Sequence, residues 1–116
     1  MDKNVQMSMM LDYYSDFLTG KQKHVLSLHY NEDMSLAEIA EQLGISRQGV
    51  HDALRRAEAV LEKAESTVQL LARIELAKEK INDLIVSVEG LRPKIDVKSY
   101  NRLKSQLDGI VSVWEE

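Results

Sequence analysis

The apolar residues between positions 35 and 57 recur at helical spacing in two short runs separated by a glycine. In each run they fall at intervals of three and four residues, which places them on one face of an α-helix. These positions are Leu36, Ile39, Ala40 and Leu43 in the first run, and Val50, Ala53, Leu54 and Ala57 in the second. The pattern predicts two amphipathic helices joined by residues 44–46.

Polar and small residues mark the ends of these two helices. Ser35 is followed three residues later by Glu38, which is the spacing of a capping box. Gly44 suits the left-handed conformation that follows many helices, and Ser46 is a favourable N-cap for the second helix. We expect Ile45 to place an apolar anchor in the turn. Two helices joined by a three-residue turn that contains glycine are typical of a helix-turn-helix.

Amphipathic patterns before this stretch extend the prediction to an all-α chain. The segment before it begins with a second capping box, formed by Thr19 and Gln22. The methionines of the first helix lie at core spacing, which favours a core role over an adaptable interaction surface. Helices are therefore expected at residues 5–17, 20–30, 36–43 and 47–65.

The second half of the chain continues the apolar pattern in heptads. From Val50 to Leu71 the apolar positions follow alternating steps of four and three residues, the a/d pattern of a coiled coil. Ser66 is a candidate cap for a new helix, so the sequence leaves open whether the helix from residue 47 breaks near residues 66–67 or runs on. The heptads favour a homodimer, with packing inside one chain as the alternative.

A glycine and a proline predict the end of this long helical region. Gly90 and Pro93 are the expected stop signals, and Asp96 can cap a last helix. The expected apolar face of that helix comprises Tyr100, Leu103, Leu107, Ile110 and Trp114. The sequence thus predicts a helix-turn-helix domain over residues 1–65, followed by a C-terminal helical hairpin over residues 66–116 that serves dimerisation or partner binding.

Composition bounds the possible functions of this chain. It has 116 residues, of which 44% are hydrophobic and 29% charged, and it contains no cysteine, so disulfides and thiolate metal sites are excluded. No signal peptide is evident, and no run approaches the roughly 18 apolar residues of a membrane helix. These features predict a cytoplasmic protein without membrane insertion. The net charge of −4 is unusual for a DNA-binding protein, although residues 46–57 carry three arginines and one aspartate.

The second helix of the predicted motif leaves a set of polar side chains off its apolar face. In a helix-turn-helix, the first residues of this helix meet base edges, and nearby basic residues meet phosphates. Arginine suits guanine, and glutamine suits adenine. The candidate DNA-binding residues are Ser46, Arg47, Gln48, His51, Asp52, Arg55 and Arg56, with Lys21 from the preceding helix.

Gly49 is unexpected inside this helix, because an interior glycine costs about 1 kcal/mol relative to alanine. It suggests close approach of a phosphate or of the helix at residues 20–30.

Enzymatic chemistry finds no support in the sequence. The three histidines, His24, His29 and His51, lack the spacing of a helical metal pair and have no cysteine partners. His51 is followed by Asp52, but adjacent residues on a helix are expected to point in different directions. Phosphate-binding glycine loops are also missing. We therefore expect no catalytic residue, no metal and no cofactor.

Three motifs resemble region 4 of bacterial sigma factors, which reads the −35 promoter element. They are LTGKQKHVL at residues 18–26, SLAEIA at residues 35–40 and GISRQGV at residues 44–50. This resemblance implies that residues 1–65 form a sigma-region-4-like helix-turn-helix domain in which Arg47, Gln48 and His51 face the bases.

A resemblance that covers nearly the whole chain is to the YlxM-type (UPF0122) family of small helix-turn-helix proteins of Gram-positive bacteria. It rests on the tyrosine pair at residues 13–14, the start of the second helix at residues 18–22, the segment SRQGVHD at residues 46–52, and the helical tail. Members are typically encoded beside the signal recognition particle GTPase, which implies a role in, or regulation of, that targeting pathway.

Two hypotheses about function follow. The first is a dimeric DNA-binding regulator, weak per monomer because few phosphates are contacted. The alternative is an adaptor that does not bind DNA and instead contacts the signal recognition particle GTPase or its RNA through its helical surfaces.

Overall fold

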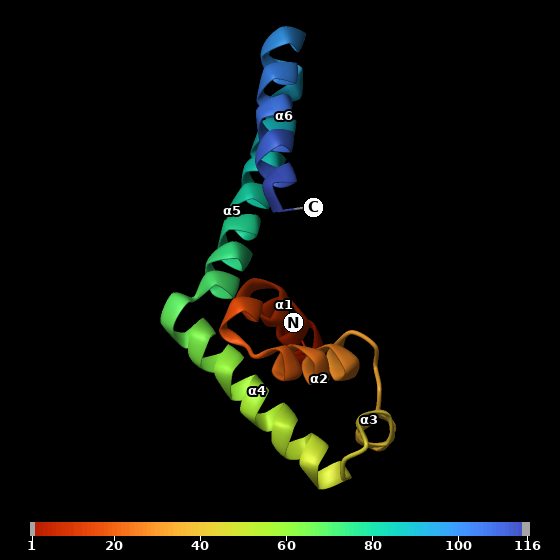
Figure 1. The fold of residues 1–116 in the computed structure, drawn as a ribbon. Coiled ribbons are helices and arrows are strands. Elements are labelled where there is room, and N and C mark those ends of the chain that lie inside the picture. Colours follow the sequence, from red (N-terminus) through yellow and green to blue (C-terminus); the bar gives the residue numbers. More distant parts are fainter. Residues whose placement is uncertain (1, 115–116) are drawn as a thin grey trace. The chain divides into compact units, whose positions relative to one another are not determined.

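The computed structural model describes residues 2–114, and this part of the chain is built from helices without a strand (Figure 1). The predicted all-α fold is therefore confirmed. Short 3-10 helices, labelled η, follow three of the α-helices. In chain order the elements are α1 Lys3–Tyr14, η1 Ser15–Phe17, α2 Gly20–Tyr30, α3 Leu36–Leu43, α4 Arg47–Val68, α5 Leu70–Leu91, η2 Arg92–Lys94, α6 Val97–Val111 and η3 Ser112–Trp114.

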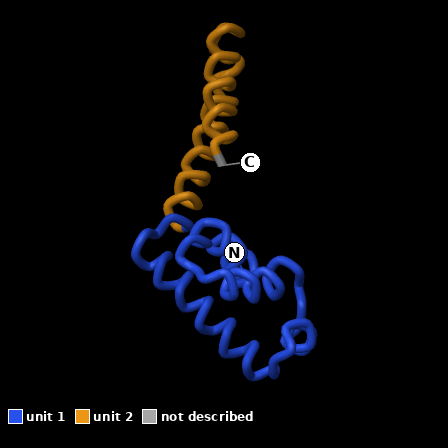
Figure 2. The backbone as a smooth tube through the Cα atoms, in the orientation of Figure 1, with its two compact units in different colours: residues 1–71 blue, residues 72–116 orange. Residues whose placement is uncertain are grey.

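The chain forms two compact units, coloured separately in Figure 2. Unit 1 comprises residues 1–71 and unit 2 comprises residues 72–116. The division thus lies within the first turn of α5, whereas the sequence pattern places the domain boundary between residues 65 and 66. No helix of the described part is both long and apolar enough to cross a membrane.

Unit 1 is organised around α4, which contacts α1, α2 and α3 (Figure 1). Four of the apolar heptad positions of α4, Val50, Leu54, Ala57 and Leu61, are almost completely buried against these helices, whereas Val68 near the end of α4 is exposed. From the other elements the core receives Met7, Met10, Leu11, Tyr14, Leu18, Val25, Leu26, Leu28, Ile39, Ala40 and Leu71. Met7 and Met10 are thus core residues, as predicted. The first heptads of α4 pack inside the unit, so the alternative of packing within one chain accounts for them.

The local signals at the helix ends act as predicted. Thr19 and Gln22 form one capping box, and Ser35 and Glu38 form another. The backbone N–H of Ser35 donates to Glu38 and thereby lowers the pKa of its carboxyl group. Gly44 adopts the left-handed conformation at φ +69°. The prediction for Ile45 is wrong, because this side chain remains 45% exposed at the turn.

The helix that begins at Arg47 breaks close to residues 66–67, which is one of the two possibilities that the sequence leaves open. It passes through Ser66 and Thr67, reaches Val68, and stops where Gln69 takes a left-handed φ of +57°. Ser66 does not cap a new helix, since its hydroxyl donates to the backbone carbonyl of Lys63 over 2.8 Å. α5 then begins directly at Leu70.

A tyrosine from α1 supports this junction. The hydroxyl of Tyr14 donates to the carboxylate of Glu65 over 2.6 Å and accepts from the backbone N–H of Leu70 over 2.9 Å. The same carboxylate oxygen accepts from the backbone N–H of Leu71 over 2.9 Å. Burial, followed by the bond to Glu65, raises the pKa of Tyr14. These bonds satisfy donors in the first turn of α5 that have no partner within the helix.

Unit 2 contains a hairpin of two antiparallel helices, α5 and α6 (Figure 1). Asp96 caps α6 by accepting from the backbone N–H of Ser99, as predicted. The prediction for Gly90 is wrong: this residue lies inside α5, which continues to Leu91, and its φ is not positive. The reversal occurs instead in η2, where Pro93 lies in the first turn.

The core of the hairpin is small. Its buried members are Val88, Tyr100 and Leu107, with Ile85, Ile95 and Leu103 partly buried around them. The hydroxyl of Tyr100 donates to Glu89, and this bond raises the pKa of Tyr100. The guanidinium carbon of Arg92 lies 5.1 Å from the centre of the Tyr100 ring. The predicted apolar face of α6 is therefore only partly covered, and the side chain of Trp114 lies outside the described part.

Candidate nucleic-acid interface

The first two turns of α4 carry the predicted base-reading residues on their exposed side. Ser46 begins the helix by accepting from the backbone N–H of Gly49 over 2.9 Å. Because an α-helix advances by 3.6 residues per turn, burial of Val50 and Leu54 directs the opposite side toward solvent. The predicted residues Ser46, Arg47, Gln48, His51, Asp52, Arg55 and Arg56 are all exposed, as is Lys21 on α2.

The turn itself explains Gly49. A Cβ at this position would lie 3.2 Å from the Oγ of Ser46 and 3.7 Å from the Cδ1 of Ile45. Neither of these neighbours belongs to α2, so the expected close approach of that helix is not the structural reason for glycine. The space beside Gly49 is instead occupied by the N-cap on which α4 depends.

A carboxylate lies among the predicted base-reading side chains. The Nε2 of Gln48 donates to the Oδ1 of Asp52 over 3.0 Å, one turn further along α4. The Nδ1 of His51 lies 3.8 Å from the same oxygen, so the two adjacent residues do meet, contrary to expectation. Asp52 thus occupies one amide hydrogen of Gln48, while the amide oxygen of Gln48 remains available to a base.

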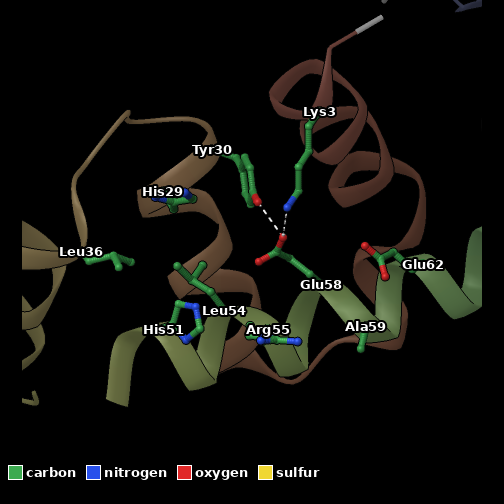
Figure 3. A pocket seen from close by; sticks show the side chains of 10 residues that line it. All are labelled: Lys3, His29, Tyr30, Leu36, His51, Leu54, Arg55, Glu58, Ala59 and Glu62. Carbon is green, nitrogen blue, oxygen red and sulfur yellow. Dashed lines mark hydrogen bonds and ion pairs between the residues drawn. The ribbon is translucent and has the colours of Figure 1, made fainter. Parts of the chain in front are cut away.

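The three basic residues expected to contact phosphates, Arg55, Arg56 and Lys21, lie at two separate places on the surface. Arg55 and Arg56 are consecutive, so their side chains leave α4 about 100° apart. Arg56 and Lys21 line one small hollow of about 150 Å³ between α2 and α4. Arg55 instead lines a larger pocket together with His51 (Figure 3). The structure therefore brings Lys21 and Arg56 together and separates them from Arg55.

The larger pocket was not predicted from the sequence. It has a volume of about 540 Å³ and is formed by side chains from α1, α2, α3 and α4. Glu58 stands within it and accepts from the hydroxyl of Tyr30 over 2.7 Å and from Lys3 over 3.2 Å (Figure 3). Burial and the bond to Glu58 raise the pKa of Tyr30. Because Glu58 and Glu62 line the same pocket as Arg55, this flank of α4 has mixed charge.

Two of the three histidines line this pocket, although their sequence spacing gives no sign of it. They are His29, whose Nδ1 lies 3.0 Å from the backbone oxygen of Met34, and His51. Within residues 2–114, no group of three or more histidine, aspartate or glutamate side chains lies close enough to hold a metal ion.

Charge is unevenly divided between the two units. Residues 1–71 contain seven basic and eleven acidic residues, whereas residues 72–116 contain eight of each. The whole net charge of −4 therefore belongs to the helix-turn-helix unit. Any attraction to nucleic acid depends on the local grouping of cations along α4 and not on the overall field of the unit.

The capped α3, the left-handed Gly44 and the exposed start of α4 define a helix-turn-helix protein. The chain belongs to the UPF0122 family, because the family model described as "Putative helix-turn-helix protein, YlxM / p13 like" matches residues 1–99. This confirms the resemblance found in the sequence.

Curated relatives support the same assignment. UPF0122 protein YlxM of Bacillus subtilis (strain 168) is 36% identical over 108 residues, covering 93% of this chain and 98% of the relative. A UPF0122 protein of Clostridium botulinum (strain Alaska E43 / Type E3) is 39% identical over 112 residues, covering 95% and 100%. One of Halalkalibacterium halodurans is 42% identical over 89 residues, covering 77% and 82%.

Proposed function

We propose that this chain is a cytoplasmic DNA-binding regulator that inserts the start of α4 into the major groove. The observation that carries the proposal is the exposed surface of Arg47, Gln48, His51 and Arg55, held at the start of a helix by the Ser46 cap. In a helix-turn-helix, these N-terminal positions of the second helix meet base edges.

The individual side chains suit different parts of DNA. Arg47 has the forked geometry for guanine, and Gln48 can offer its amide oxygen to a base amino group. Arg56 and Lys21, which line one hollow, form a pair of phosphate contacts, and Arg55 supplies another. Few contacts of this kind give weak binding per monomer that depends strongly on salt.

Titration of the protein against random duplex DNA, followed by fluorescence anisotropy at several salt concentrations, tests the proposal. We expect a measurable slope of log K against log salt, and Arg55→Ala is expected to reduce that slope by about one. Lys63→Ala is the matched control, because Lys63 is an exposed cation on the same helix that lies two turns beyond Arg55.

The outcome is decided by the difference between these two variants. Equal loss in both would indicate general attraction to positive charge, and no binding by the wild type would reject DNA as the ligand. Once an operator is selected, Arg47→Ala is expected to cost about 1–3 kcal/mol at one base position. Uniform loss over all sequences would argue against base reading by Arg47.

A second candidate function is an adaptor in the signal recognition particle pathway, which contacts the GTPase or its RNA without binding DNA. The excess of acidic residues in unit 1 favours this alternative, since it opposes binding to phosphates in general. Anisotropy with signal recognition particle RNA, and capture of the purified GTPase, distinguish it from the regulator. Binding to the GTPase together with no salt-dependent DNA binding would support the adaptor.

A further inference from the structure

Both helices of the hairpin carry a heptad pattern with two rows of apolar residues. One row, here called the inner row, comprises Ile74, Ile81 and Val88 on α5 with Tyr100 and Leu107 on α6. The other, here called the outer row, comprises Ala77, Leu84 and Leu91 on α5 with Leu103 and Ile110 on α6. Along each helix the rows alternate at steps of three and four residues, as a and d positions do.

The two rows differ in burial on both helices. The three buried residues of the hairpin, Val88, Tyr100 and Leu107, all belong to the inner row. In the outer row Leu84 is 49% exposed, while Leu91 and Ile110 are each 42% exposed. The two helices thus cover the inner row around Val88, Tyr100 and Leu107, where Leu103 of the outer row is also partly buried, and they leave Leu84, Leu91 and Ile110 open.

The two halves of the outer row lie on one face of the hairpin. On each helix, an outer-row residue follows an inner-row residue by three positions. Because an α-helix turns by 100° per residue, the outer row is rotated from the inner row by the same angle and in the same direction about each helix axis, viewed from its N-terminus. Because the helices are antiparallel, this common sense of rotation directs both displacements to the same side of the pair. The open side chains of Leu84, Leu91 and Ile110 therefore lie on the same face of the hairpin.

A hairpin with so small a core needs further burial. Two helices that bury three large side chains gain little hydrophobic stabilisation to offset the conformational entropy of ordering them. In bundles of four helices, both the a and the d rows face the core. The outer row is therefore the surface that a second pair of helices would cover.

We propose that the outer row is a contact surface between two copies of this chain, whose hairpins pair as a four-helix bundle. A second copy carries the same heptads, so its own outer row presents apolar side chains at matching spacing. Its charge is also compatible, because eight basic and eight acidic residues in residues 72–116 give two hairpins no net repulsion. The contact is independent of whether unit 1 binds DNA.

The sequence pattern assigns dimerisation or partner binding to this hairpin as a whole, and the outer row specifies which of its faces makes the contact. The heptad positions of α4 from Val50 to Leu61 are covered within unit 1, whereas Leu84, Leu91 and Ile110 of the outer row are open. A twofold contact of this kind is isologous, so one substitution changes both sides of it at once.

Sedimentation equilibrium of the full chain tests the proposal. The wild type is expected to have twice the chain mass of 13.2 kDa, with dissociation on dilution. Leu84→Asp places two carboxylates in the contact and is expected to raise the dimer dissociation constant at least about tenfold, which corresponds to about 1.4 kcal/mol. Circular dichroism establishes that the variant keeps its helices, and Leu91→Asp serves as a second variant if it does not.

Val86→Asp is the matched control. Val86 lies on the same helix, is 72% exposed and belongs to neither row, so the same charge is introduced away from the contact. This variant is expected to remain dimeric. A monomeric wild type at every concentration, or equal weakening by Leu84→Asp and Val86→Asp, would overturn the proposal.

Discussion

α4 and α5 have the same length and similar heptads, but their surroundings differ. Each contains 22 residues. In α4, Val50, Leu54, Ala57 and Leu61 are almost completely buried because three helices pack around it. In α5, the middle of the helix has α6 as its neighbour within unit 2, and Leu84 remains half-exposed.

This difference shows what a heptad pattern does and does not indicate. The pattern identifies the side of a helix that avoids water. It does not distinguish a partner within the chain from a second copy, because both bury the same positions. On α4 the partner is within the chain. On α5 one of the two rows still lacks a partner among the described residues of unit 2.

The largest effect is expected for a core leucine of α4. Leu61 is fully buried, so Leu61→Ala should lower the free energy of unfolding of unit 1 by about 2–5 kcal/mol. Leu76→Ala makes the same change on α5 at a side chain that is 55% exposed, and should cost less than about 1 kcal/mol. Urea denaturation followed by circular dichroism measures both. Similar costs would mean that the two helices are equally supported.

A smaller effect on the free energy of unfolding is expected when either of two tyrosines that donate to a glutamate is replaced by phenylalanine. Tyr14→Phe leaves Glu65 and the N–H of Leu70, both partly buried, without this partner, at a cost of about 1–3 kcal/mol. Tyr100→Phe removes a bond to the exposed Glu89 and should cost about 0.5 kcal/mol. Urea midpoints measure both, and faster amide exchange at Leu70 in the Tyr14 variant alone would locate the effect.

The pH dependence provides a second measurement on Tyr14. Its pKa is raised in the folded protein, so the folded state holds this proton more tightly than the unfolded state. The corresponding stability is complete below the ordinary tyrosine pKa and is lost as the pH rises through the raised value. Tyr14→Phe is therefore expected to make the stability of unit 1 less sensitive to alkaline pH. An unchanged alkaline profile would contradict this role.

The smallest effects, of opposite sign, are expected at two glycines. Gly44 has φ +69°, so Gly44→Ala should destabilise unit 1 by about 1 kcal/mol. Gly90 lies inside α5 with nothing within 4 Å of an added Cβ, so Gly90→Ala should stabilise the hairpin by about 0.5–1 kcal/mol. Thermal denaturation measures both shifts. Destabilisation by both substitutions would contradict the helical assignment of Gly90.

Features encoded within a few residues could be predicted from the sequence. The capping box of Ser35 and the left-handed Gly44 each depend on neighbours at most four residues away. Local signals indicate a break near residues 66–67 only as one of two possibilities, and they do not decide whether the α4–α5 junction forms. The junction depends on Tyr14, which lies 51 residues before Glu65, and neither glycine nor proline marks the break at Gln69.

The features of the candidate site can also be separated into those that depend on nearby residues and those that depend on distant ones. Exposure of the α4 residues follows from helical period, and the angle between Arg55 and Arg56 follows from it as well. The bond between Gln48 and Asp52 spans four residues and is also a local feature. The pocket that contains Glu58 could not be derived from spacing, because Lys3 and Tyr30 come from two other helices.

The burial of α4 against three earlier helices also has a consequence for synthesis. Residues 1–46 contain α1, α2 and α3, but the core that these helices share also needs the side chains from Val50 to Leu61, which are synthesised later. At about 5–20 residues per second, a ribosome needs on the order of 4 to 14 s to reach Leu71. Until α4 has emerged, the methionines and leucines of α1 and α2 lack the helix that covers them, and transiently exposed apolar surface of this kind is prone to aggregation.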